Sequence, residues 1–377
     1  MSSAASSSSS ETLIADRESS PHALRWLLIR GLSSLEELLV PLLGFMVSMS
    51  LFGVFIALVG KPPLEVFAQM YRGAFGTTFS FQNTLMRAAP LMLTGLCTAL
   101  PARLGLIVIG GEGALVVGGV TAAAVAPALS SASSVTIQLA MALAATIMGG
   151  LWIAAAGWLK VSRGVNETIS SLLLSYLGIA LMNHLVEGPL KDPASLNKPS
   201  TFPIGEANML PNLPGMDLHY GLLLGVLACL LCSLLMDQSR FGFASRVVGG
   251  NVRAARLAGL PVARLVVLAC FLGGAAAGLA GMIEVAAVHG KANGSLICGY
   301  GYTGILVAFL ARHSPLAVMP VALLLGGISA SGGLLQRSFG LPDASVNVLQ
   351  GVLFVVLLTS ESYRGKLRPF RHWTQRV

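Results

Sequence analysis

The sequence is poor in charged side chains, because Asp, Glu, Lys and Arg make up 11% of its 377 residues. Soluble domains carry roughly 25%. A water-soluble fold of this length needs more charge to cover its surface, so this composition excludes an ordinary soluble protein. Long uncharged runs, such as residues 38–59 and 137–159, indicate that lipid is the solvent. The sequence therefore predicts an all-α, polytopic membrane protein.

The chain also lacks the motifs of ATP binding and of common enzymes. It contains no Gly-x-x-x-x-Gly-Lys-Ser/Thr phosphate-binding loop, and neither His-Glu-x-x-His nor Gly-x-Ser-x-Gly occurs. These absences argue against an enzyme and predict no catalytic residue. We expect no cofactor on this chain, so that any ATP is bound by partner subunits.

Cysteine is scarce, with five residues in the whole chain. Cys229 and Cys232 form a Cys-x-x-Cys pair, which in a soluble protein suggests metal or redox chemistry. Here the two intervening residues are leucines in the middle of an apolar segment. We therefore predict neither a disulfide nor a metal site.

About ten segments are close to the roughly 20 residues that cross a bilayer. They are residues 38–60, 83–102, 104–126, 135–160, 168–187, 220–236, 263–288, 297–311, 315–333 and 343–360. Most of the 24 lysines and arginines fall on one side of these segments. The positive-inside rule then places both termini in the cytoplasm. The same asymmetry accounts for the net charge of +8 without a nucleic-acid partner.

The rest of the chain divides by composition. Residues 1–34 are rich in serine and predict a disordered or surface cytoplasmic tail, 35–361 form the membrane domain, and 362–377 form a basic cytoplasmic tail. Residues 64–75 predict a short amphipathic helix at the outer interface. Residues 188–219 are rich in proline, which prevents regular helix, and predict the longest external loop. That loop is either a passive connection or a contact with an external partner.

The segment 237–262 predicts a short helix on the cytoplasmic side. Asn251 is a favourable N-cap, Gly259 suits the left-handed residue that ends a helix, and Pro261 prevents continuation. A helix of about two turns is not stable alone and needs a partner surface. That surface is either anionic lipid or a soluble cytoplasmic subunit.

Four motifs in the same order resemble the permease family of ABC importers that serves branched-chain amino acids, simple sugars and nucleosides. They are residues 90–96 with 109–113, residues 163–170, residues 248–259 and residues 299–308. The resemblance covers roughly residues 40–360 and is closest to nucleoside and simple-sugar permeases. The sequence departs from the family pattern at Val108, Ala114 and Ser175, which leaves the solute open.

This resemblance implies a permease subunit of an ATP-driven importer for a small polar solute, in the bacterial inner membrane. Its implied partners are cytoplasmic ATPase subunits, a second and non-identical permease, an extracytoplasmic solute-binding protein and membrane lipid, but no nucleic acid polymer. The implied ATPase-coupling residues are Gly249, Asn251, Ala254, Ala255, Arg256, Ala258 and Gly259. The alternative is an ion-coupled secondary transporter, for which Glu112 is the only good ion-binding carboxylate. A purely structural scaffold would leave the Gly-interrupted spans unexplained.

Two predicted spans, 104–126 and 297–311, are interrupted by glycine at matching positions, a pattern that indicates a site near the membrane midplane. A carboxylate inside a span is costly, so we expect Glu112 to meet backbone amides freed at a broken helix or, alternatively, solute. Asn166 is most simply an N-cap, and the two tyrosines suit either stacking on a flat ring or an interfacial position. The candidate pathway residues are Glu112, Gly110, Gly113, Asn166, Glu167, Ser175, Tyr300 and Tyr302.

Overall fold

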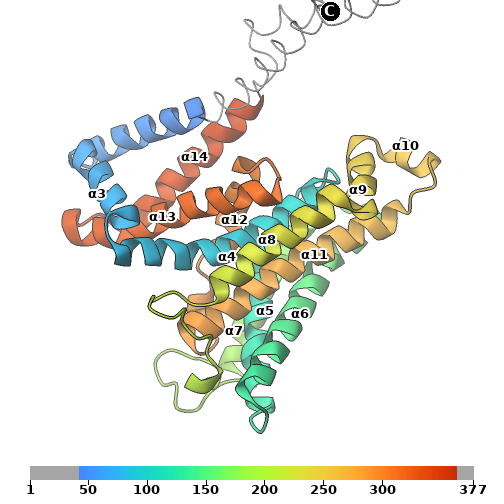
Figure 1. Cartoon of the computed structure of the whole chain (residues 1–377), viewed down its shortest axis with the longest axis horizontal. Coiled ribbons are helices and arrows are strands. Elements are labelled where there is room, and N and C mark those ends of the chain that lie inside the picture. Colours follow the sequence, from blue (N-terminus) through green and yellow to red (C-terminus); the bar gives the residue numbers. More distant parts are fainter. Residues whose placement is uncertain (1–41, 363–377) are drawn as a thin grey trace, which may run out of the picture. The chain divides into compact units, whose positions relative to one another are not determined.

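The computed structural model describes residues 42–362, with side chains to residue 360 (Figure 1). The predicted N-terminal tail lies outside these residues, as does nearly all of the predicted C-terminal tail. Among the described residues, seven helices are long and apolar enough to cross a membrane, or eight if Leu42–Leu58 and α3 (Pro63–Phe75) form one broken span. The prediction of a mostly helical, polytopic protein is confirmed.

The candidate spans alternate with shorter helices. The seven spans are α4 (Thr78–Ala102), α5 (Gly111–Ala128), α6 (Ser134–Arg163), α7 (Glu167–Glu187), α8 (Gly221–Gln238), α11 (Val262–Ile283), which continues through the π-helical turn Glu284–His289, and α13 (Pro315–Phe339). The shorter elements are α9 (Arg240–Gly250), α10 (Val252–Leu257), α12 (Tyr300–Leu310), α14 (Ala344–Ser362) and the 3-10 turns Glu206–Asn208 and Gly294–Leu296. As predicted, no long helix forms in the proline-rich segment between α7 and α8.

The chain divides into two units. The larger is Ile56–Gln350, and the described part of the smaller consists of residues 42–55 and 351–362. Within the smaller unit, a Cβ added to Gly44 would lie 3.0 Å from Leu357 Cδ2, so its two segments pack closely there.

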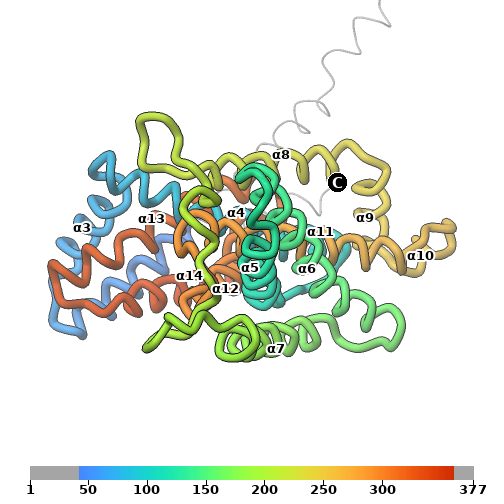
Figure 2. Tube along the Cα trace, turned by 90° about the horizontal axis from the view of Figure 1, so that it is seen from below, coloured from blue at the N-terminus to red at the C-terminus, as the bar shows by residue number. Residues whose placement is uncertain are grey.

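In the larger unit, α4, α5 and α11 are buried over most of their length, whereas α6, α7 and α8 remain mostly exposed. Figure 2 shows α7 and α8 on opposite sides of α5 in that view. The exposed residues of α6 include apolar side chains four positions apart, which line one face of a helix. They are Val135, Leu139, Leu143, Ile147 and Leu151. This face suits lipid, so the exposure of apolar residues agrees with a membrane protein.

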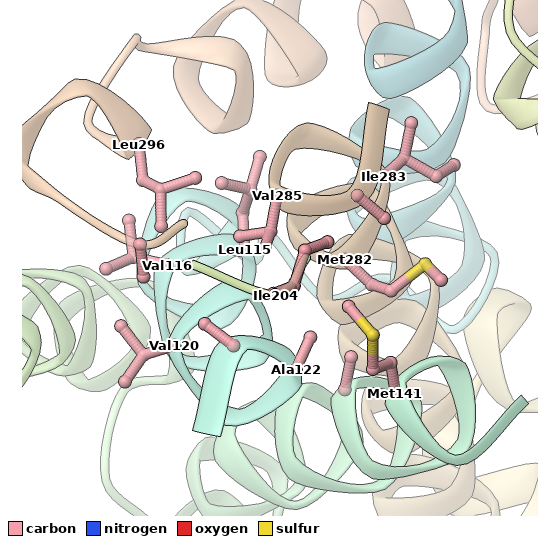
Figure 3. Packing of buried hydrophobic residues seen from close by; sticks show 14 of the residues in the cluster. Leu115, Val116, Val120, Ala122, Met141, Ile204, Met282, Ile283, Val285 and Leu296 are labelled. Carbon is pink, nitrogen blue, oxygen red and sulfur yellow. The ribbon is translucent and has the colours of Figure 1, made fainter. Parts of the chain in front are cut away.

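Small residues bring the central helices together. A Cβ added to Gly118 of α5 would lie 2.5 Å from the Cα atom of Gly278 in α11, and one added to Gly149 of α6 would lie 2.6 Å from the same atom. Apolar side chains from α5, α6 and α11 fill the space beside these contacts (Figure 3). Close backbone approach of this kind is typical of helices packed in membranes. It fixes α5, whose first turn carries Glu112.

Candidate coupling and translocation site

The segment between α8 and α11 forms two short helices, α9 and α10, at one end of the bundle (Figure 1). Asn251 caps α10, because its Oδ1 accepts hydrogen bonds from the backbone N–H groups of Arg253 (2.9 Å) and Ala254 (3.1 Å). Gly259 follows with φ of +76°, a conformation that favours glycine. The predicted short helix and its two boundary residues are confirmed. The preceding helix α9, capped by the Ser239 hydroxyl, was not predicted.

The residues of α10 divide between the chain's own core and its surface. Ala255 is fully buried in a cluster with Leu104 and Val248, whereas Leu257 is 90% exposed. Six of the seven predicted coupling residues are exposed, namely Gly249, Asn251, Ala254, Arg256, Ala258 and Gly259. Gly249 is exposed on one side and on the other lies against the backbone at Arg103. The face available to a partner is therefore the one that carries Leu257 and Arg256, while Ala255 fastens α10 to this chain.

The chain leaves helical geometry before α5, so the prediction of a helix from residue 104 is wrong at its start. Residues 103–110 are non-helical. They begin with a turn over residues 103–105, in which Gly105 has a φ of +78°. Hydroxyl groups hold this stretch at several of its carbonyl groups. Thr98 donates to the Val108 carbonyl (3.1 Å) and Thr168 to the Ile107 carbonyl (2.9 Å). The apolar composition of the run conceals this break, because its hydrogen bonds go to distant side chains.

Two serines of α7 hold the next residue in the same way. Ser171 Oγ accepts from the Ile109 N–H (3.0 Å), and Ser175 Oγ donates to the Ile109 carbonyl (3.3 Å). Both serines are fully buried. Ser175, a predicted pathway residue, therefore bonds to the backbone here. Ser171 was missed, although a serine one turn before Ser175 on the same face is a usable signal.

Gly110 and Gly113 are required by the same packing. A Cβ at Gly110 would overlap the Ile153 side chain, and one at Gly113 would lie 2.6 Å from the Cα atom of Ser175. Real Cβ atoms do not approach other atoms so closely, so these glycines let α5 lie directly on α6 and α7. Gly110 and Gly113 were predicted as pathway residues, and in the structure close packing against α6 and α7 accounts for both glycines.

Glu112 joins the two interrupted segments. It is fully buried in the first turn of α5, and its Oε1 and Oε2 accept hydrogen bonds from the N–H groups of Gly299 (2.8 Å) and Gly301 (2.6 Å). A Cβ at Gly301 would overlap the backbone nitrogen of Glu112. The amides that satisfy Glu112 therefore belong to the start of α12 rather than to its own helix. Since both carboxylate oxygens are occupied, this geometry does not favour the ion-coupled alternative.

Asn166 and Glu167 lie at the turn between α6 and α7. Asn166 is the N-cap of α7, as predicted, and accepts from the N–H groups of Thr168 (2.9 Å) and Ile169 (3.2 Å). Glu167 pairs with Lys160 at 2.6 Å, with side-chain exposures of 10% and 39%. These contacts stabilise the turn between α6 and α7, and none of them involves Glu112.

The two tyrosines of α12 have different surroundings. Tyr300 is half-buried against the core of α5, α6 and α11, whereas Tyr302 is 38% exposed. Next to them, the Thr303 hydroxyl bonds to Gln350 Oε1 (3.3 Å), and Gln350 Nε2 donates to the Ser329 hydroxyl (2.9 Å). The sequence analysis did not single out Gln350, although an amide within an apolar segment is a recognisable signal.

Residues 80–358 match the family described as branched-chain amino acid transport system / permease component. The chain belongs to this family. It is therefore the membrane-spanning permease subunit of an ABC transporter and a polytopic membrane protein. Family membership implies cytoplasmic ATPase subunits and a solute-binding protein as partners.

Curated relatives cover most of the permease. The glucose ABC transporter permease protein TsgB13 of Haloferax volcanii is 32% identical over 86% of this chain and 88% of its own length. The guanosine ABC transporter permease protein NupP of Bacillus subtilis is 28% identical over 89% of this chain and 97% of its own length. NupQ, a guanosine ABC transporter permease protein of the same organism, is 23% identical over 73% of this chain and 89% of its own length.

Proposed function

We propose that this permease imports a nucleoside or a simple sugar, with the energy supplied by ATP hydrolysis on separate cytoplasmic subunits. The substrate class is supported by the glucose and guanosine relatives. The separate site of ATP hydrolysis is supported by the absence of a Gly-x-x-x-x-Gly-Lys-Ser/Thr motif from this sequence. ATP is then a ligand of the partner subunits, and this chain needs no cofactor of its own.

The topology that accompanies this proposal has ten spans and both termini in the cytoplasm. It counts the broken pair Leu42–Leu58 with α3 once and adds the shorter apolar helices Gly294–Leu310 and Ala344–Ser360 to the seven long ones. The α9–α10 segment then lies in the cytoplasm, where the basic residues between the spans gather. Lipid surrounds the apolar face of α6.

The assembly in this proposal contains a second, non-identical permease and an external solute-binding protein. Support for two different permeases comes from Bacillus subtilis, in which two distinct proteins carry the name of guanosine permease. The long loop between α7 and α8 lies on the outer side in this topology, where a solute-binding protein delivers its cargo.

The observation that carries the proposal is the exposed face of α10. Leu257 is 90% exposed beside the exposed Arg256, although the helix is capped at Asn251 and fastened to the chain by Ala255. A short, rigidly held helix with a protruding leucine suits insertion into a groove on an ATPase subunit. Movement of that subunit on ATP binding and hydrolysis then shifts the permease between outward-open and inward-open states.

Co-purification in mild detergent tests this proposal. We expect the ATPase subunit to accompany the tagged wild-type chain and to be lost, by at least about tenfold, from Leu257→Asp and Arg256→Glu, because an unpaired carboxylate buried in an apolar groove is costly. Uptake of labelled guanosine and glucose by cells that carry the same variants gives a second readout.

The matched control is Leu196→Asp in the loop between α7 and α8, where Leu196 is 87% exposed. It places the same charge on an equally exposed leucine away from α10, and we expect it to retain the ATPase. Retention of the ATPase by Leu257→Asp and Arg256→Glu alike would reject α10 as the coupling helix. Ala255→Asp is unsuitable for this purpose, because that side chain is buried within the permease.

A further inference from the structure

Arg103 connects two parts of the permease that are far apart in sequence. It follows the last residue of α4 and is half-buried. Its Nε donates a hydrogen bond to the carbonyl of His313 at 2.9 Å. His313 lies in the turn between α12 and α13, so the side chain of Arg103 reaches the far end of the helix that begins at the Glu112 contact.

The backbone of Arg103 lies against the coupling segment, α9–α10. A Cβ added to Gly249 would overlap the carbonyl oxygen of Arg103 and would lie 3.3 Å from the Cα atom of Leu104. Leu104 also belongs to the buried cluster that contains Val248 and Ala255. Because closely packed backbones have no room to slide independently, a displacement of the coupling segment displaces residues 103 and 104.

The turn that Arg103 contacts has an unfavourable backbone conformation. Arg312 and His313 have φ values of 53° and 57°, the left-handed region that residues other than glycine rarely adopt. Such a conformation persists only where its surroundings hold it. The His313 N–H bonds to the Ala308 carbonyl (2.8 Å), and its ring packs against Phe309 at 5.0 Å. The bond from Arg103 adds a long-range contact, so the turn responds to the position of α4's end.

We infer that Arg103 is a positioning residue that transmits movement of the coupling segment to α12, whose other end rests on Glu112. The inference rests on the proposed function, since it takes α10 as the contact with the ATPase. It joins three observations: Gly249 against the Arg103 carbonyl, the Arg103–His313 hydrogen bond, and the hydrogen bonds from Gly299 and Gly301 to Glu112.

Hydrogen–deuterium exchange on the complete importer tests this inference without a known solute. Exchange is compared between the nucleotide-free complex and the complex with MgATP and vanadate, for peptides that cover residues 251–259 and 308–316. In the wild type we expect nucleotide to change exchange in both peptides. In Arg103→Ala we expect the change at 251–259 to remain and the change at 308–316 to fall at least fivefold.

Two further variants sharpen the comparison. Arg103→Lys keeps a cationic donor within reach of the carbonyl and is expected to restore the response at 308–316, which a general loss of structure would not allow. Arg264→Ala removes an exposed arginine at the start of α11 and is expected to behave as the wild type. Arg103→Met, which keeps an unbranched side chain of similar length without an N–H donor, replaces Arg103→Ala in the comparison if the alanine variant does not assemble.

The outcomes separate the two proposals. A wild-type complex whose 251–259 peptide ignores nucleotide would overturn the coupling role of α10 itself. An Arg103→Ala or Arg103→Met complex in which both peptides still respond would overturn the positioning role of Arg103 alone.

Discussion

Replacement of Glu112 measures how strongly the two interrupted segments are joined. Its carboxylate accepts two short backbone hydrogen bonds, at 2.8 Å from Gly299 and 2.6 Å from Gly301, in a fully buried position. Hydrogen bonds to a charged group contribute about 1.5–3 kcal/mol each. Glu112→Gln keeps the side-chain shape and one accepting oxygen, but its amide NH2 then faces a backbone N–H. We expect the free energy of unfolding to fall by about 2–4 kcal/mol, which is one lost bond plus the donor–donor contact.

Thermal unfolding of the purified permease in detergent is the assay. With about 2 °C lost for each kcal/mol in a large domain, Glu112→Gln is expected to lower Tm by roughly 4–8 °C. Glu112→Ala leaves both amides without an acceptor and is expected to lower Tm further. The control is Glu206→Gln, which neutralises an exposed carboxylate in the 3-10 turn Glu206–Asn208.

The relative Tm values of these variants test whether the Glu112 hydrogen bonds stabilise the fold. A Tm for Glu112→Gln equal to that of Glu206→Gln would refute the argument, because the lost bond and the donor–donor contact would then cost no stability. A larger loss in Glu112→Gln than in Glu112→Ala would also contradict it, since the alanine variant abolishes both bonds.

Two other predictions concern packing and pH. Gly301→Ala is expected to destabilise the permease by about 1–3 kcal/mol in the same assay, because its Cβ would overlap the α5 backbone. The control is Gly333→Ala on α13, where a Cβ meets open space, and an equal Tm for the two variants would contradict the prediction. Burial lowers the pKa of His219, which lies in the loop before α8. The unfolded chain therefore binds a proton more readily than the folded one, so the fold loses stability as the pH falls below the ordinary histidine pKa of about 6.5 and keeps its full stability above that pH. We expect Tm to fall more between pH 7.5 and 5.5 in the wild type than in His219→Gln, whereas the exposed His184→Gln should match the wild type; an identical pH dependence in all three would rule this out.

Local signals predicted the boundaries of α10 correctly. Asn251 and Gly259 act within three residues of themselves, through a cap bond and a left-handed φ, so the sequence contains the information needed. The preceding helix α9 was missed for the opposite reason. It contains Gly242, where a Cβ would overlap the Met236 carbonyl, and it ends in two glycines that read as helix breakers. Close packing requires Gly242 and Gly249 and overrides their low helix propensity, whereas a Cβ at Gly250 would meet open space.

The start of α5 could not be placed from the apolar pattern. Residues 106–109 are all hydrophobic, and although Gly105 and Gly110 flank them, this pattern does not show at which residue the helix begins. The bonds that replace the helical ladder come from Thr98 on α4 and from Thr168, Ser171 and Ser175 on α7. Most of these partners lie more than 60 positions away in the sequence, so only the folded arrangement reveals which hydroxyl meets which carbonyl.

The polar residues predicted for the pathway divide into two kinds by what they contact. Glu112 and Ser175 are fully buried and use their oxygens on backbone groups of the interrupted segments, whereas Tyr302 is 38% exposed and keeps a face open. Groups that satisfy backbone amides cannot also select a solute without breaking those bonds, which is costly in a buried site. We therefore expect solute to be recognised by exposed side chains such as Tyr302 rather than by Glu112 or Ser175. Such a division agrees with the match of the same chain to relatives named for glucose and for guanosine, since different solutes are then served by different side chains on one framework.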